Sequence, residues 1–318
     1  MNEPLDRDPP VANPEIEMEW KLAFVGDSPS QALESLESFP TREGLRLERD
    51  SEILLRDVYF DLPDRALSAR RIALRLREKN GRMRATLKGA GVTDESGLSA
   101  RPEFEVDFVG AATIDSLRAV LKEWGVDPGT AASREPGVEK PDGHSVENPT
   151  RLLEGELGVE VVQERSTRRT LFHLREDRVE ESDVTLAEVA FDRVVYDSPA
   201  GSVIHFEIEV EMQSAGESSQ TEASECVARV EGWCRELRAR FGSDLIPFGL
   251  DKLSFGAWIA RHPELRGGER DDPGTGRNSG ASGERAFEPY DSGIRPTRAA
   301  YRSANRGRAT EDRTSQRG

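Results

Sequence analysis

The stretch EIEMEWKL, residues 15–22, decides the fold class because charged and apolar residues alternate along it. Successive side chains of a β-strand point to opposite faces, so a period of two predicts a strand with one apolar face and one charged face. The apolar face carries Ile16, Met18, Trp20 and Leu22, and the charged face carries Glu15, Glu17, Glu19 and Lys21. This stretch predicts a sheet whose second face is unusually rich in charge.

The same alternation recurs along the chain, and Asn80-Gly81 between two of the runs is a turn sequence typical of a β-hairpin. Apolar residues at helical spacing predict helices within 28–39, 114–124, 223–241 and 252–260. The further strand-like runs are LRLERDSEILLRDVYFDLP (45–63), IALRLREK (72–79), RMRATLKG (82–89), RPEFEVDF (101–108), TRRTLFHLRED (167–177), DVTLAEVAFDRVVYD (183–197) and SVIHFEIEVEM (202–212). This order predicts an α+β domain built on an antiparallel meander.

Only 36% of the 318 residues are hydrophobic and 33% are charged, so the folded part is expected to be shorter than the chain. We expect one domain over 14–262. Residues 1–13 are predicted to form a disordered leader, 127–150 an inserted loop and 263–318 a disordered tail, because these segments lack apolar periodicity.

The composition excludes several classes of function. A formal net charge of −16 argues against non-specific binding to nucleic acid or to an anionic membrane, which depends on excess lysine and arginine. The four histidines and two cysteines have no zinc-ligand spacing, and Cys226 and Cys234 are too far apart on one helix for a disulfide. No secretory signal or membrane span is evident, so we expect a cytoplasmic protein.

The charges on the predicted strands are segregated by sign. Acids gather in two strands, at 15–19 and 207–211, whereas bases gather at 75–79 and 82–88 and continue with Arg165 and Arg169. An ordinary antiparallel sheet with one solvated face would account for any single strand. A closed barrel with a charged lumen would account for all of them together: its carboxylates would bind Mg²⁺ or Mn²⁺, and its basic residues would bind a polyanion such as a phosphate chain.

These residues also match a family pattern. Glu17-x-Glu19-x-Lys21 resembles the E-x-E-x-K signature of the CYTH superfamily, which includes inorganic triphosphatases, thiamine triphosphatases and class IV adenylate cyclases. Further matches follow in order between Glu15 and Ala260. They are YFD (59–61), LRLR (74–77), TLKG (86–89), RPEFEV (101–106), TRR (167–169), FD (191–192), FEIEVE (206–211) and GLDKLSFG (249–256).

The resemblance implies a closed eight-stranded antiparallel β-barrel, a tunnel with flanking helices and a charged lumen. It implies that Glu17, Glu19, Glu207 and Glu209 bind the metal, with Lys21 and Glu19 in the catalytic step. Glu103, Asp192 and Glu211 are expected in the lining or beside it, and which two of Glu207, Glu209 and Glu211 touch metal stays open. The substrate-binding residues implied are Lys21, Arg75, Arg77, Lys88, Arg169 and Lys252.

The expected activity is metal-dependent hydrolysis of a small-molecule triphosphate, with tripolyphosphate as the first choice and thiamine triphosphate or a nucleoside triphosphate as others. No P-loop or Ser/His or Cys/His constellation appears, so direct attack by water is the expected chemistry. The alternatives are a class IV adenylate cyclase, a non-catalytic polyphosphate or nucleotide binder, and a structural acidic protein with outward-facing charges.

Overall fold

The computed structural model describes residues 14–39, 44–129, 148–176, 184–197, 202–213, 220–262 and 295–305. The strands are β1 (Glu15–Phe24), β2 (Leu45–Asp61), β3 (Ala73–Lys79), β4 (Arg82–Lys88), β5 (Val92–Thr93), β6 (Leu98–Asp107), β7 (Glu160–Glu176), β8 (Val184–Tyr196), β9 (Val203–Met212) and β10 (Leu245–Pro247). The α-helices are α1 (Pro29–Glu37), α2 (Ala66–Ala69), α3 (Ala111–Glu123), α4 (Pro149–Leu157), α5 (Gln220–Phe241) and α6 (Lys252–Ala260), and residues 298–305 are also helical.

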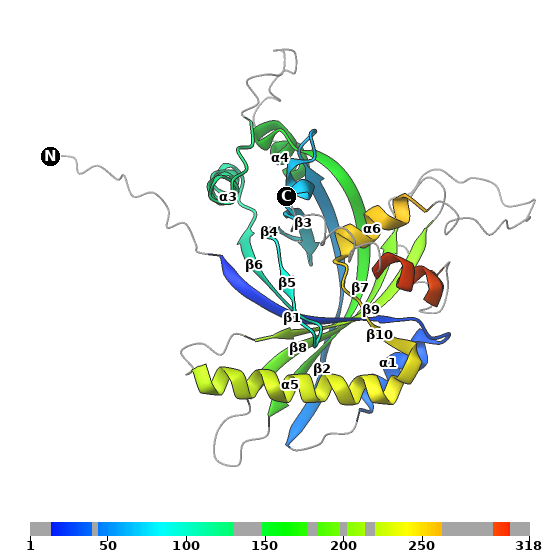
Figure 1. Ribbon diagram of the computed structural model, residues 1–318. Helices are drawn as coiled ribbons and strands as arrows, with labels where there is room; N and C mark the ends of the chain where they lie inside the picture. Colours follow the sequence, from blue (N-terminus) through cyan, green and yellow to red (C-terminus); the bar gives the residue numbers. More distant parts are fainter. Residues whose placement is uncertain are drawn as a thin grey trace, which may run out of the picture. The chain divides into compact units, whose positions relative to one another are not determined.

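Eight strands are hydrogen-bonded in the order β1-β9-β8-β7-β2-β3-β4-β6, and β6 pairs again with β1 (Figure 1). The sheet is therefore a closed antiparallel barrel, which confirms the predicted fold class. The short strands β5 and β10 pair with β6 and β1 outside this ring. The turn between β3 and β4 is the predicted one: Asn80 and Gly81 both have positive φ, at 53° and 74°.

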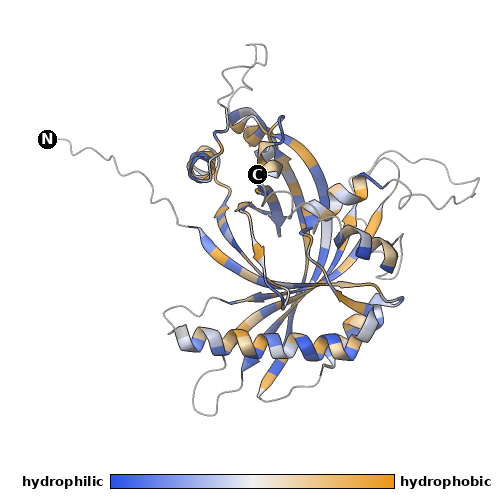
Figure 2. Cartoon of the chain, in the orientation of Figure 1, coloured by the Kyte–Doolittle hydropathy of each residue, from blue (hydrophilic) through white to orange (hydrophobic). Residues whose placement is uncertain are grey.

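The chain divides into two compact units that share three of the strands. Unit 1 comprises Met1–Trp20 and Ile53–Ser166, and unit 2 comprises Lys21–Glu52 and Thr167–Gly318. In unit 1 the apolar residues of β3 and β4 pack with α3 and α4 in one core, where Leu74, Leu87, Leu117 and Leu153 are fully buried. This packing explains why the strands of unit 1 alternate between hydrophilic and hydrophobic residues (Figure 2).

In unit 2 the long helix α5 contacts β8, β9 and β10. Its buried residues include Val230, Trp233, Cys234 and Leu237, which continue the apolar stripe predicted from the sequence. A second core of this unit joins α6 to the ends of β8 and β9, with Phe255 fully buried in it. The α6 core includes Val194, Tyr196 and Val203, which lie on the same face of these strands as Asp192 and Glu207, so α6 packs on the charged face of β8 and β9, beyond its acids.

Two helical segments differ from the expectations for their part of the sequence. Helix α4 begins at the edge of the predicted loop 127–150, where the Asn148 side chain accepts a hydrogen bond from the Thr150 N–H at 3.0 Å. Residues 295–305 belong to the predicted tail, yet Tyr301 is 2% exposed within the core of unit 2. The leader 1–13, most of the predicted loop (130–147) and the remainder of the tail lie outside the described residues.

Both cysteines are free thiols, as their spacing predicted, and burial raises the pKa of Cys234. Among the residues that the structure describes, no helix combines the length and the apolar character needed to cross a membrane.

Candidate functional site

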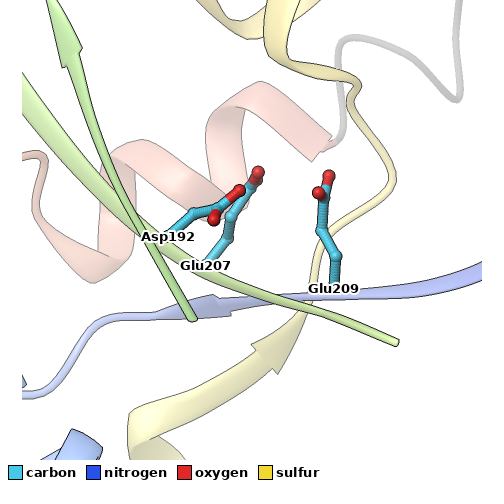
Figure 3. A group of neighbouring side chains, drawn as sticks. All are labelled: Asp192, Glu207 and Glu209. Atoms are coloured by element: carbon cyan, nitrogen blue, oxygen red, sulfur yellow. The ribbon is translucent and has the colours of Figure 1, made fainter. Parts of the chain in front are cut away.

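Three carboxylates of unit 2, Asp192, Glu207 and Glu209, form a cluster that we call the acid triad (Figure 3). Asp192 of β8 lies directly opposite Glu207 of β9, and Glu209 follows two residues later on the same face. One oxygen from each residue lies within 4.8 Å of the others. Asp192 and Glu207 are fully buried, so strand register brings three negative charges together away from solvent.

Lys252 is the cation that contacts all three acids. Its ammonium lies 2.9 Å from Asp192 Oδ2 and 2.7 Å from Glu209 Oε1, and it also forms an ion pair with Glu207. Lys252 is the first residue of α6, where the helix dipole disfavours positive charge. The side chain nevertheless stays buried there, because three carboxylates compensate for its desolvation.

Arg169 and Lys21 complete the charge balance of the acid triad. Arg169 of β7 donates to both oxygens of Asp192 at 2.8 and 2.7 Å, and to Glu209 Oε2 at 2.6 Å. Lys21 of β1 lies 3.0 Å from Glu209 Oε1. Three cations thus face three anions, and each pairing crosses between different elements of unit 2.

The pKa values in this cluster follow from that balance. Burial by itself disfavours the charged form of Glu209, yet Lys252, Lys21 and Arg169 outweigh it and hold the pKa of Glu209 well below its usual range. The pKa of Asp192 is lowered in the same way by Arg169 and Lys252 against the effect of burial. The pKa of Lys252 is raised, because its attraction to the acids exceeds the cost of its burial. All of these groups are therefore charged near neutral pH.

A second group of charges lies in unit 1, where β1 pairs with β6 and β6 with β4. Glu17 lies opposite Arg101, whose Nε donates to Glu17 Oε2 at 2.7 Å and whose Nη2 donates to Glu19 Oε1 at 2.8 Å. Lys88 binds Glu17 Oε1 at 2.6 Å and Glu103 Oε1 at 3.2 Å. We call these five residues the signature cluster, since it holds both acids of the E-x-E-x-K sequence.

The remaining predicted bases of unit 1 have other partners. Arg77 donates two hydrogen bonds to the buried carboxylate of Asp57, at 2.7 and 2.9 Å. Arg165 of β7 also donates to Asp57, at 3.2 and 3.1 Å. Arg75 donates to the Thr86 hydroxyl at 3.0 Å. Arg77 and Arg165 thus belong to one buried ion-pair network around Asp57.

The structure therefore brings the sequence-predicted residues together in separate groups, each within one unit. Asp192, expected in the lining, is a full member of the acid triad, while Glu211 lies opposite Glu188 and outside it. Of the predicted residues, Asp192, Glu207 and Glu209 form the acid triad, and Lys21, Arg169 and Lys252 are paired with it. Glu17, Glu19, Lys88 and Glu103 belong to the signature cluster, and Arg75 and Arg77 have the partners given above.

Sequence reasoning missed three residues that contact these groups. Arg101 stands two residues before Glu103 in an alternating strand, and that spacing could have placed it on the same face. His205 stands two residues before Glu207 on β9 and binds it, with Nε2 2.8 Å from Glu207 Oε2. Tyr301, whose hydroxyl lies 2.9 Å from His205 Nδ1, carried no signal in the sequence because its surroundings lack apolar periodicity.

Solved structures that resemble this chain include those of the following three proteins. One is a proposed adenylyl cyclase from Hippeastrum with a dominant triphosphatase activity. It shares 17% sequence identity with this chain, and the match covers 76% of this chain and 96% of that chain with a TM-score of 0.44. A proposed adenylate cyclase from Bacillus halodurans matches with 18% identity, over 76% of this chain and 97% of that chain, with a TM-score of 0.37. An RNA triphosphatase from S. pombe matches with 10% identity, over 71% of this chain and 85% of that chain, with a TM-score of 0.34.

A comparison with curated proteins finds no match. The family model described as the CYTH domain matches residues 15–230, which is more than half of the chain. That range begins at β1, includes the complete ring of eight strands and contains every member of the signature cluster. By this match the protein belongs to the CYTH family.

Proposed function

We propose that this protein hydrolyses a small-molecule triphosphate with the help of Mg²⁺ or Mn²⁺, and that tripolyphosphate is its first-choice substrate. The observation that carries the proposal is the acid triad with Lys21, Arg169 and Lys252 directly on it. At this site, carboxylates that can coordinate a divalent cation lie in contact with lysine and arginine side chains that can bind phosphate oxygens. Membership of the family with triphosphatases and cyclases supports the same class of substrate.

The donor set of the acid triad fits a hard divalent cation. Its three carboxylates offer oxygen ligands only, and their low pKa values leave them ionised without acid–base change on binding. We infer that Glu207 and Glu209 are metal ligands, as the sequence predicted, and we add Asp192 to them. When bound, the cation would act as a Lewis acid toward phosphate oxygens.

The three cations are proposed to bind the phosphate chain. Arg169 uses Nε and Nη2 on carboxylates, and within the described residues its Nη1 makes no hydrogen bond, so the two N–H donors of Nη1 remain for phosphate oxygens. Lys21 supplies an ammonium at the same place. The donors of the Lys252 ammonium lie on the three acids, and a divalent cation bound to those acids would free them for phosphate. As charge shifts onto the leaving oxygens, these donors would stabilise it without moving.

The reaction that follows is water attack on the terminal phosphorus. One P–O anhydride bond breaks, the shortened phosphate chain leaves with its electron pair, and the proton of the water passes to a base of the protein. We propose Lys21 and Glu19, which are two residues apart on β1, for the catalytic step. Glu17 and Glu19 are proposed to bind metal. Arg75, Arg77 and Lys88 are proposed to bind phosphate. The cytoplasm remains the proposed location.

The experiment is phosphate release from tripolyphosphate, thiamine triphosphate, ATP and pyrophosphate, each with Mg²⁺ or Mn²⁺ and with EDTA. We expect metal-dependent release from at least one triphosphate and little from pyrophosphate. Glu209→Gln should lower turnover by at least about a hundredfold, equivalent to about 2.7 kcal/mol of transition-state stabilisation, while the exposed Glu15→Gln should stay within about twofold. Formation of cyclic AMP from ATP would instead identify a cyclase, and binding of triphosphate without turnover would identify a binder.

A further inference from the structure

Residues 295–305 pack within unit 2, although they are well separated in sequence from the other described residues of this unit. The helix at 298–305 begins after Thr297, whose carbonyl oxygen accepts a hydrogen bond from the Tyr301 N–H at 3.1 Å. Tyr301 and Ala304 are each 2% exposed, and the Tyr301 ring lies against Phe248 and Phe255 with centroids 5.6 and 5.5 Å apart. This helix, red in Figure 1, lies beside α6.

Polar contacts at both ends hold the segment in place. Asn305 donates to the Pro247 carbonyl oxygen at 3.1 Å and accepts from the Gly249 N–H at 3.2 Å. At the other end, Arg298 donates to the Ser243 hydroxyl at 2.9 Å. The segment is thus tied to the chain on each side of β10, so the position of Tyr301 is set by more than ring packing.

The Tyr301 hydroxyl begins a buried chain of hydrogen bonds that ends on the acid triad. It lies 2.9 Å from His205 Nδ1, and His205 Nε2 lies 2.8 Å from Glu207 Oε2. His205 and Glu207 are fully buried, so these bonds are shielded from water. In Figure 3 the helix of residues 298–305, in faint red, passes behind Asp192 and Glu207.

The direction of these bonds follows from which groups can accept. A carboxylate only accepts, so His205 Nε2 carries the proton and donates it to Glu207. In a neutral imidazole Nδ1 then has a free lone pair, which accepts from the Tyr301 O–H. Burial raises the pKa of Tyr301, so the phenol keeps the proton that it donates. The hydroxyl therefore matches the tautomer that Glu207 requires and holds the ring from its other nitrogen.

We propose that Tyr301 is a positioning residue that acts through His205 to hold Glu207 in the orientation used in the acid triad. This inference rests on the proposed function, because it assigns to Glu207 a role in metal binding. With Oε2 held by His205, Oε1 is left facing the Lys252 ammonium and the other acids. Hydrogen-bond partners that orient a ligand in this way change metal affinity or activity by about 10–100-fold when they are removed.

The first measurement compares Tyr301→Phe with the exposed neighbour Arg302→Ala in the full chain. The phenylalanine keeps the ring but removes the hydroxyl, so circular dichroism melts should show a folded protein. The Mn²⁺ dissociation constant, from calorimetry without substrate, should rise by about tenfold or more in Tyr301→Phe and stay unchanged in Arg302→Ala. An unchanged affinity in Tyr301→Phe, or no Mn²⁺ binding by the wild-type chain, would overturn the proposal.

A double-mutant cycle with His205→Leu then separates positioning from packing. If Tyr301 acts through His205, Tyr301→Phe should change the Mn²⁺ affinity less than twofold once His205 is leucine. If the losses of Mn²⁺ affinity in Tyr301→Phe and His205→Leu were additive in the double variant, the hydroxyl would act by another route and the inference would be overturned. Failure of the proposed function is seen separately: wild-type protein that binds Mn²⁺ but releases no phosphate would refute hydrolysis, while the cycle would still decide the role of Tyr301.

Discussion

Arg101 and Glu17 face each other across the β1–β6 pair, and the Arg101 Nε lies 2.7 Å from Glu17 Oε2. The same guanidinium reaches Glu19 at 2.8 Å, so one side chain spans both acids of the signature. Burial opposes ionisation of Glu17, but Lys88 and Arg101 outweigh it and lower the pKa of this carboxyl. Arg101 therefore helps to keep Glu17 charged and holds the two acids at a defined separation.

Arg101→Lys should reduce turnover of the preferred triphosphate by about tenfold or more, because an ammonium cannot make two directed bonds to two carboxylates. The kcat/KM of this variant measures the effect, with the exposed Arg82→Lys as a matched control. A variant as active as the wild type would show that the spacing of Glu17 and Glu19 does not depend on Arg101.

Lys252→Met should destabilise the protein in EDTA by about 3 kcal/mol or more, because it leaves three buried acids with one cation fewer. A divalent cation would compensate for the lost charge, so the rise in Tm with Mg²⁺ should be larger than in the wild type. Turnover should nevertheless fall, since a proposed phosphate contact is gone. Equal Mg²⁺ shifts in the two proteins would argue against metal binding at the acid triad.

Asp57→Asn should lower the free energy of unfolding by about 3 kcal/mol or more at pH 7, because it removes the charge shared by Arg77 and Arg165. Glu78→Gln breaks the exposed pair with Arg56 and should cost less than about 0.5 kcal/mol.

The pH dependence of this difference has a definite sign. Burial opposes ionisation of Asp57, yet Arg77 and Arg165 hold its folded-state pKa well below that of the unfolded chain. Its contribution is complete above the unfolded pKa of about 3.9 and is lost as pH falls through the folded value. Urea denaturation should therefore show the wild type and Asp57→Asn converging as the pH falls below about 4. A constant difference would mean that Asp57 is not stabilised as a carboxylate.

Thermal melts with Ca²⁺ at matched ionic strength should rank the anions as tripolyphosphate, pyrophosphate and orthophosphate, in order of falling Tm shift. A ligand at a hundredfold excess over its Kd stabilises the folded state by about 2.7 kcal/mol, and longer phosphate chains offer more oxygens to the basic residues. Arg169→Ala should reduce the shift for tripolyphosphate. Identical shifts for all three anions would contradict a site built for a phosphate chain.

The strands of the barrel were predictable because alternation is local in the sequence, whereas the closure of the barrel was implied by the family resemblance. The alternation in 15–22 and in the later strands specifies which residues face the core, and Asn80-Gly81 supplies the positive φ values that a tight hairpin requires. The family pattern also placed Lys21, Arg169, Glu207, Glu209 and Lys252 among the charged residues of a site. The strand and turn inferences use residues a few positions apart, and the family pattern uses the order of short motifs along the chain.

What only the tertiary structure decided is which charges meet. Alternation puts Glu17, Glu207 and Arg101 on charged faces, but strand register and helix placement determine that Arg101 pairs with Glu17 and that Lys252 lies on the acid triad. The helix at 298–305 could not be predicted, since it is short and polar and becomes favourable only when Tyr301 enters a core formed by distant residues. Ion pairs and the packing of distant segments depend on which residues come close in space. A periodic sequence specifies which face of a strand or helix a side chain occupies, but it does not specify which residue of another element that side chain contacts.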